Sequence, residues 1–172
     1  VRDDETAKIA IQASLTGHLV LSTVHTNSAI GAITRLRDMG IESFLLASSL
    51  KTIISQRLIR RLCNHCKTTE KLTIGMAKNF QLEENTTVYV PRGCDQCEGR
   101  GYFGRVAIAE SIQIDSKLKN MIHESASEQE ISKYAFTNNQ PIDQLAKELI
   151  INGLTSSAEL LRIKTQKEDA SI

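Results

Sequence analysis

Residues 19–24 read Leu19-Val20-Leu21-Ser22-Thr23-Val24, a short run of apolar and β-branched residues without polar alternation. Such a run is typical of a strand that is buried on both faces, as in a parallel sheet. A helix is predicted on each side of it. Residues 4–16 begin with acidic residues and end at Gly17, and the next segment repeats apolar residues at helical spacing, at Ile30, Ile33, Leu36 and Met39. The order of helix, buried strand and helix predicts an α/β fold.

The rest of the chain divides by composition, which gives three predicted segments: 1–62, 63–104 and 105–172. Residues 43–62 carry a helical stripe of apolar side chains, so a second long helix is expected there. Residues 63–104 are polar and glycine-rich, and we interpret them as an insert that something other than a hydrophobic core must hold. A period-2 pattern over residues 106–114 predicts an extended segment. Helix-start signals at Asp115, Ser127, Pro141 and Thr155 then predict three or four short helices.

The composition excludes several classes of protein. Of the 172 residues, 41% are hydrophobic and 24% are charged, which indicates a globular chain and not a disordered one. The net charge of +1 gives no global attraction to nucleic acid or acidic lipid. No apolar run reaches the ~18–20 residues that span a bilayer, and no signal peptide is recognisable, so a cytoplasmic chain is expected. Because Val1 is not an initiator methionine, we expect a fragment.

All four cysteines lie in two CxxC motifs, Cys63 with Cys66 and Cys94 with Cys97. Thiolates two residues apart on a tight turn can bind one ion at ~2.3 Å, and two such turns complete a closed tetrahedral site. The sequence therefore predicts a structural zinc site. An iron–sulfur cluster is the main alternative, and disulfides or a thioredoxin-like redox pair are less compatible with a cytosolic chain that has two copies of the motif.

Two histidines flank the predicted buried strand, and His25 lies beside its carboxyl end, where open α/β sheets bind ligands. His18 lies at the other end. The alternative is that both imidazoles only satisfy hydrogen bonds in loops. Arginines at positions 2, 35 and 105 could bind a phosphate through bidentate hydrogen bonds, or they could be solvated surface residues.

Several motifs together carry a resemblance to a known family. They are the stretches Val1–Ala7, Leu15–Asn27, Thr34–Gly40, Gln56–Cys63 and Gly101–Arg105, together with the four cysteines. The chain thereby resembles, over nearly its whole length, the hexameric secretion ATPases of type II secretion and type IV pilus assembly. The resemblance implies the C-terminal portion of a RecA-like P-loop motor domain, with a zinc-binding insert and a small C-terminal helical module.

The resemblance also implies roles for single residues. His25 would be the residue of the family's His box that senses the γ-phosphate, Arg2 would follow the Walker B segment, and Arg35 and Arg105 would lie around the nucleotide cleft or a subunit boundary. The P-loop, the Asp box and the Walker B glutamate are not among these residues, so the cofactor-binding residues stay unknown and the fragment alone is expected not to hydrolyse ATP. ATP and Mg²⁺ would be cofactors of the intact protein.

The resemblance implies an ATPase that powers type II secretion by assembling a pseudopilus. It would be a hexamer in the cytoplasm, peripheral to the bacterial inner membrane, and would engage platform proteins of that membrane. A type IV pilus assembly ATPase is the alternative within the family. An alternative of another class is a zinc-ribbon module for protein interaction or nucleic-acid binding, which the near-zero net charge and the scarcity of aromatic residues disfavour.

Overall fold

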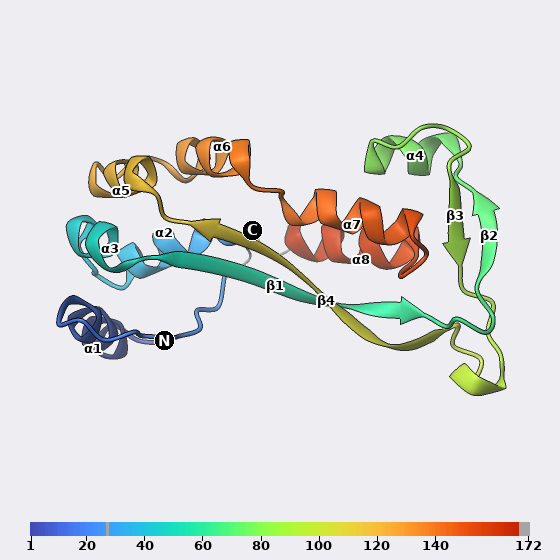
Figure 1. The fold of residues 1–172 in the computed structure, drawn as a ribbon, viewed down its shortest axis with the longest axis horizontal. Coiled ribbons are helices and arrows are strands. Elements are labelled where there is room, and N and C mark those ends of the chain that lie inside the picture. The colour runs from blue at the N-terminus through green and yellow to red at the C-terminus, as the bar shows by residue number, and fades with distance from the viewer. Residues whose placement is uncertain (27, 169–172) are drawn as a thin grey trace. The chain divides into compact units, whose positions relative to one another are not determined.

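The protein is represented by a computed structural model that describes residues 1–26 and 28–168, without the side chains of residues 138, 143 and 163–168. Figure 1 shows the order of its elements. Helices and strands follow one another as α1 (Asp4–Leu15), α2 (Gly31–Asp38), α3 (Ser43–Ser49), β1 (Thr52–Leu62), β2 (Thr68–Lys71), α4 (Ile74–Phe80), β3 (Thr87–Val90), the 3-10 turn η1 (Asp95–Cys97), β4 (Tyr102–Gln113), α5 (Ser116–His123), α6 (Glu128–Asn138), α7 (Ile142–Ile151) and α8 (Ser157–Glu168). The predicted α/β class is confirmed.

The chain forms two compact units. The first comprises Val1–Ser55 and Glu110–Gln140, and its core is built by α1, α2, α3, α5 and α6. Apolar positions at helical spacing, together with Ile112 of β4, supply this core. Its fully buried side chains include Ile33, Leu46, Ile112, Leu118 and Ile122.

The second unit comprises Gln56–Ala109 and Pro141–Ile172. Strands β1 and β4 pair in one two-stranded sheet, and β2 and β3 pair in another, antiparallel one in which Thr68 faces Val90 and Lys71 faces Thr87. A second core joins residues of the cysteine-bearing segment to residues of α7 and α8: Ile59, Leu72, Phe80, Val88, Ile108, Ala146, Ile150 and Leu160. The prediction that something other than a hydrophobic core must hold residues 63–104 is therefore wrong, because α4 and β3 bury apolar side chains against these helices.

The predicted buried strand at residues 19–24 does not form. This segment has no regular secondary structure, and the side chains of Leu19 and Leu21 are 86% and 87% exposed. A strand needs a neighbour for its backbone hydrogen bonds, and within residues 1–26 and 28–168 no strand pairs with this segment. The backbone nitrogen of Val1 donates a hydrogen bond to the carbonyl of Thr23, 2.6 Å away.

The predicted long helix over residues 43–62 is also wrong. Helix α3 ends at Ser49, and the backbone becomes extended at Leu50 and continues as strand β1. Ile54 and Leu58, which belong to the predicted stripe, are 64% and 50% exposed, whereas Ile59, outside that stripe, is fully buried. Short apolar runs are ambiguous between helix and strand, and here the β-branched Thr52, Ile53 and Ile54 and the pairing with β4 decide for the strand.

The predicted helix starts are confirmed where the signal is local. Asp115 caps α5 by accepting a hydrogen bond from the backbone N–H of Leu118, and Ser127 forms a capping box with Glu130 at α6. Pro141 precedes the first residue of α7. The cap of α8 is Ser156 and not Thr155, because the Thr155 hydroxyl donates to the carbonyl of Arg60 instead.

Alternation along β4 also agrees with the sequence, since Ile108, Glu110 and Ile112 are buried and their neighbours are exposed. The division into segments 1–62, 63–104 and 105–172 stays a prediction. Among the residues that the structure describes, no helix has both the length and the apolar character that a bilayer crossing requires.

Candidate functional site

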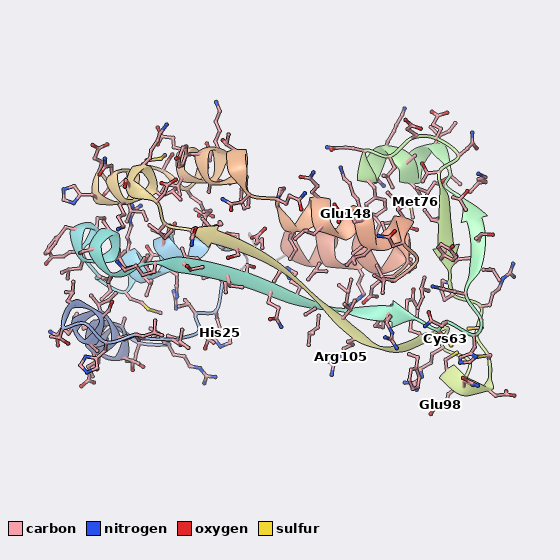
Figure 2. The ribbon with its side chains drawn as sticks, viewed as in Figure 1. His25, Cys63, Met76, Glu98, Arg105 and Glu148 are labelled. Atoms are coloured by element: carbon pink, nitrogen blue, oxygen red, sulfur yellow. The ribbon has the colours of Figure 1, made fainter. Side chains whose placement is uncertain are left out.

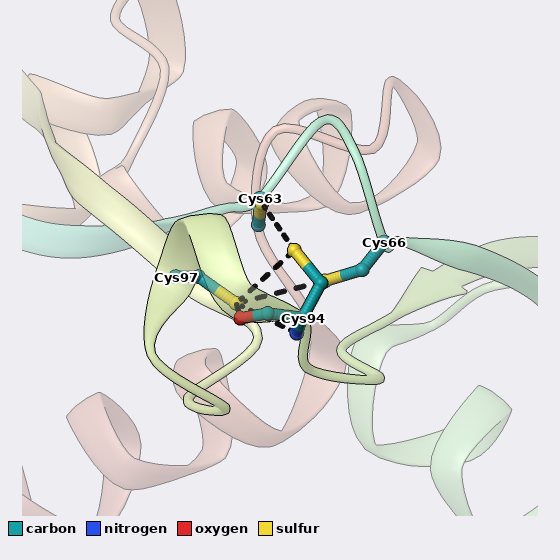
Figure 3. A group of neighbouring side chains, drawn as sticks. All are labelled: Cys63, Cys66, Cys94 and Cys97. Carbon is teal, nitrogen blue, oxygen red and sulfur yellow. Dashed lines mark hydrogen bonds between the residues drawn. The ribbon is translucent and has the colours of Figure 1, made fainter.

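The four cysteines of the two CxxC motifs converge on one point. Cys63 directly follows β1, Cys66 lies in the turn before β2, and Cys94 and Cys97 lie at either end of one 3-10 turn (Figure 3). Their Sγ atoms all lie within 4.8 Å of one another. The Sγ–Sγ distances are 3.9 Å from Cys63 to Cys94, and 3.8 Å from Cys97 to both Cys66 and Cys94. The predicted ligands therefore form one group.

These distances have the size that a tetrahedral metal site requires. Four thiolates at about 2.3 Å from a central zinc ion place neighbouring sulfur atoms about 3.8 Å apart. All four cysteines are free, and the observed separations are far longer than the ~2.05 Å of a disulfide bond. Cys63 and Cys97 are buried, so these two cysteines would shield a bound ion from water.

Backbone N–H groups around the cluster favour the thiolate form. The N–H groups of Cys94 and Gly101 each donate to the Sγ of Cys97 at 3.2 Å, and Gly93 donates to the Sγ of Cys66 at 3.2 Å. Burial opposes ionisation of Cys97, but these hydrogen bonds outweigh it and lower the pKa of its thiol to about 7. Burial dominates at Cys94 and raises the pKa of its thiol to about 11.

The turn that presents Cys94 depends on glycine. Gly93 has a φ of +100°, and a Cβ atom at this position would lie 2.5 Å from the backbone oxygen of Gly99. A side chain there would meet both a strained backbone and a backbone clash. The glycine-rich composition of the segment therefore serves the geometry of the sulfur cluster.

The first cysteine motif is tied to the turn between α7 and α8. The N–H of Leu62 donates to the carbonyl of Leu154 at 2.9 Å, and the ammonium of Lys67 donates to the carbonyl of Gly153 at 2.9 Å. Lys67 also lies 4.9 Å from the centre of the Tyr89 ring, which packs against Gly153. Leu62 and Lys67, which bind the α7–α8 turn, are therefore adjacent in sequence to the predicted metal ligands Cys63 and Cys66.

A buried carboxylate, Glu159, holds α8 against β1. It accepts hydrogen bonds from the backbone N–H and the guanidinium of Arg60 and from the guanidinium of Arg162, with ion-pair distances of 2.6 Å and 2.9 Å. Burial opposes its ionisation, but these donors outweigh burial and lower the pKa of Glu159 to about 2. Sequence reasoning missed this group, although Ser156 and Glu159 have the Ser-x-x-Glu spacing of a helix start.

The predicted nucleotide-sensing residues are all exposed. His25 lies on the segment before α2 and Arg105 on β4 (Figure 2). Arg2 precedes α1, and Arg35 lies on α2. Within the described part of the chain, none of their side chains makes a hydrogen bond or an ion pair. Arg105 belongs to the second compact unit and the other three to the first. The sequence also predicts Asn27 as the cap of the helix that follows, and this residue lies outside the described residues.

Two further acidic residues, both missed by sequence reasoning, contact the segment that follows His25. The Glu110 carboxylate, buried on β4, accepts a hydrogen bond from the N–H of Ala29 at 3.4 Å. Glu128 on α6 accepts from the hydroxyls of Ser28 and Thr34 at 3.2 Å and 3.3 Å. A signal for Glu110 was available, since it interrupts the apolar positions of the period-2 pattern in β4.

The sequence matches the family model described as "Type II/IV secretion system protein" over residues 1–162. It is 45% identical over 166 residues to the type II secretion system protein E of Klebsiella pneumoniae. This alignment covers 96% of this chain and 33% of the relative. Identity to the type II secretion system ATPase E of Vibrio cholerae is 44% over 95% of this chain and 33% of that protein. Identity to the type IV pilus assembly ATPase TfpB of Acinetobacter baylyi is 39% over 95% of this chain and 29% of that protein. The chain thus spans about a third of the length of the curated relatives it matches.

Among solved structures, the fold is similar to that of the pilus retraction motor PilT with bound ADP. The TM-score is 0.64 at 24% sequence identity, over 95% of this chain and 37% of that one.

Proposed function

The chain belongs to the type II/IV secretion system protein family, and from that premise we propose that it serves in an ATP-hydrolysing motor of type II protein secretion. One observation carries the proposal: nearly the whole chain aligns at 44–45% identity with relatives named for type II secretion, one of them named an ATPase. The 39% identity to a pilus assembly ATPase is lower, which favours secretion over pilus assembly.

The proposal extends to the assembly and its surroundings. The motor would be a hexamer in the cytoplasm that binds ATP and Mg²⁺, lies against the inner membrane and drives platform proteins there. The 172 residues contain no GxxxxGKS or GxxxxGKT loop to cradle phosphates, so we propose that they do not hydrolyse ATP by themselves. Their contribution would be a sensing segment and a metal-bound module.

We infer that the cysteine cluster binds zinc. The sulfur spacing supports one ion at the centre of a tetrahedron, whereas an iron–sulfur cluster would insert several iron and sulfide atoms between the thiolates. A closed site of four thiolates leaves no position for a reactive water, so the role would be structural. Zinc when bound would supply a cross-link between the ends of residues 63–97.

The metal assignment can be tested on the chain itself. After purification without added metal, elemental analysis is expected to find about one zinc per chain, lost in Cys94→Ser. Glu98→Ser is the matched control, because Glu98 is exposed in the same turn and pairs only with Arg100 among the described residues. Visible absorption typical of iron–sulfide charge transfer would contradict the zinc assignment.

We propose that His25 senses the γ-phosphate, with Arg2, Arg35 and Arg105 supplying positive charge near the phosphates or at a subunit boundary. The exposure of all four side chains supports this role, since each is free to meet a ligand.

The test is His25→Ala in the full-length protein, with His18→Ala as the control. His18 is an exposed histidine of the same segment whose ring already bonds within the chain, to Thr16 and to the carbonyl of Ala13. We expect His25→Ala to lower ATP hydrolysis and secretion, and His18→Ala to leave both close to wild type. Unchanged hydrolysis and secretion in His25→Ala would refute the sensing role.

A further inference from the structure

The segment that follows His25 is held by side chains from two elements that lie far from it in the sequence. From β4, the buried carboxylate of Glu110 reaches the N–H of Ala29. From α6, the two carboxylate oxygens of Glu128 reach two different hydroxyls, those of Ser28 and Thr34. The contacts bridge 81 to 100 positions of sequence, so they are tertiary restraints and not local turns.

Local hydrogen bonds connect these anchors to the backbone next to His25. The hydroxyl of Thr26 donates to the carbonyl of Ser28 at 2.9 Å, and the hydroxyl of Ser28 accepts from the N–H of Gly31 at the start of α2. Ser28 is therefore bonded to Thr26, the residue directly after His25, to Gly31 at the start of α2 and to Glu128. A displacement of the His25 backbone would strain the contact with Glu128.

Gly31 lets these groups approach one another. A Cβ atom at this position would lie 2.9 Å from the Ser28 hydroxyl and 3.6 Å from the nearer carboxylate oxygen of Glu128. A side chain there would wedge between the serine and the carboxylate. The absence of a side chain at Gly31 thus allows the Ser28 hydroxyl to contact the Glu128 carboxylate.

The other end of α2 is fixed to the same region. The guanidinium of Arg37 donates to the carbonyls of Ala126 and Ile122, at 3.1 Å and 2.9 Å, in the turn between α5 and α6. Helix α2 is therefore bonded at both ends to residues 122–128, and Glu128 is the contact at the end nearer His25.

We propose that Glu128 and Glu110 are positioning residues for His25: together they fix residues 28–31, and Glu128 couples the His25 segment to α6. A buried carboxylate costs free energy unless it is hydrogen-bonded, and at Glu110 it lies between the aliphatic Ile108 and Ile112. The inference rests on the proposed sensing role of His25. It adds a route by which nucleotide contact at His25 would reach α6.

The first test needs no nucleotide and uses the 172-residue chain. In Glu128→Ala, amide hydrogen exchange of residues 24–31 is expected to rise about tenfold, as loss of charge-assisted hydrogen bonds predicts, while α1 keeps its protection. Thr34→Val, which removes one hydroxyl at constant shape, should give a smaller rise at the same residues. Glu124→Ala is the matched control, because Glu124 is an exposed carboxylate in the α5–α6 turn without a side-chain hydrogen bond among the described residues. Exchange at 24–31 equal to that of the control would refute the inference alone.

The second test uses ATP hydrolysis by the full-length protein as a double-mutant cycle. Glu128→Ala is expected to lower kcat more than it raises KM, and to have no further effect in a His25→Ala background. An equal effect of Glu128→Ala with and without His25 would overturn the positioning role. Faster exchange with unchanged hydrolysis in both single variants would refute the sensing role itself and, with it, this inference.

Discussion

Replacing Glu159 by alanine removes a carboxylate at the centre of the second unit. Its side chain is completely buried, and it bonds to the backbone and guanidinium of Arg60 and to the guanidinium of Arg162. Arg60 also stacks on the ring of Tyr102, 4.2 Å from its centre, and the Tyr102 hydroxyl lies 2.6 Å from the Ser156 hydroxyl. The substitution therefore removes the group around which the start of α8 is bonded to β1.

The size of the effect follows from what is left behind. Removing one partner of a buried ion pair costs about 3–5 kcal/mol, because the remaining charge is buried without compensation. The two arginine side chains are 49% and 47% exposed, so their guanidinium groups can turn toward water. The backbone N–H of Arg60 cannot. We therefore expect a loss near the lower end, about 3 kcal/mol of the free energy of unfolding.

Urea unfolding followed by circular dichroism measures this loss, with Glu148→Ala as the control. Glu148 is an exposed glutamate on α7 in the same unit (Figure 2), and its replacement should change stability by less than about 0.5 kcal/mol. A loss below about 1 kcal/mol in Glu159→Ala would refute the reasoning, since the network would then not stabilise the unit.

The same carboxylate gives a pH dependence with a defined sign. Its pKa is lowered from 4.5 to about 2 in the folded protein, so its contribution is fully present above pH 4.5 and is lost as the pH falls toward 2. The difference in stability between wild type and Glu159→Ala should therefore shrink between pH 4.5 and 2. A difference that stays constant across this range would contradict the assigned ion pair.

Three shorter predictions concern glycine, arginine and the metal. Gly153→Ala should lower the free energy of unfolding by more than about 1 kcal/mol, because φ is +64° and a Cβ would lie 2.4 Å from the Tyr89 ring. Gly75→Ala in α4, where a Cβ would meet no atom within 4 Å, should raise the free energy of unfolding by about 0.5–1 kcal/mol. Urea unfolding of both variants measures these changes. Arg37→Ala should cost about 2 kcal/mol in the same assay, because two carbonyls of the α5–α6 turn lose their donors, and a change under 0.5 kcal/mol would contradict this. Removal of metal by a chelator should speed amide exchange at residues 63–66 and 93–101 but spare α4 and α7, whose core includes Phe80; equal loss of protection in the helices would contradict an independent core.

The parts of the fold that the sequence predicts correctly are those with local causes. Asp115 and Ser127 bond to backbone groups three residues away, so the signal and its partner lie in one short stretch. The cysteine spacing is similarly informative, since each CxxC motif brings two ligands together by itself. Only the meeting of the two motifs, with Cys63 and Cys94 3.9 Å apart, needed the fold.

The parts that fail depend on partners distant in sequence. The apolar stripe from residue 43 onward fits either a helix or a strand, and the pairing of β1 with β4 selects the strand after Leu50. Glu159 and Glu110 were missed for the same reason. A carboxylate at a buried position has meaning only once its donors are known, and these donors lie 99 and 81 residues away.

The largest disagreement between pattern and structure lies at residues 19–24, next to His25. Their apolar side chains suit a buried strand, yet Leu19 and Leu21 are almost fully exposed. Because the chain spans about a third of the length of its curated relatives, this exposure describes the 172 residues and not the longer proteins. Directly after this segment, the Glu128 carboxylate accepts a hydrogen bond from the Ser28 hydroxyl, and the Glu110 carboxylate accepts one from the N–H of Ala29. The turn after His25 is therefore held by side chains of β4 and α6, whatever covers the apolar segment before it. An anchored turn suits a residue that must present its side chain to a ligand in a defined position, which is the role proposed for His25.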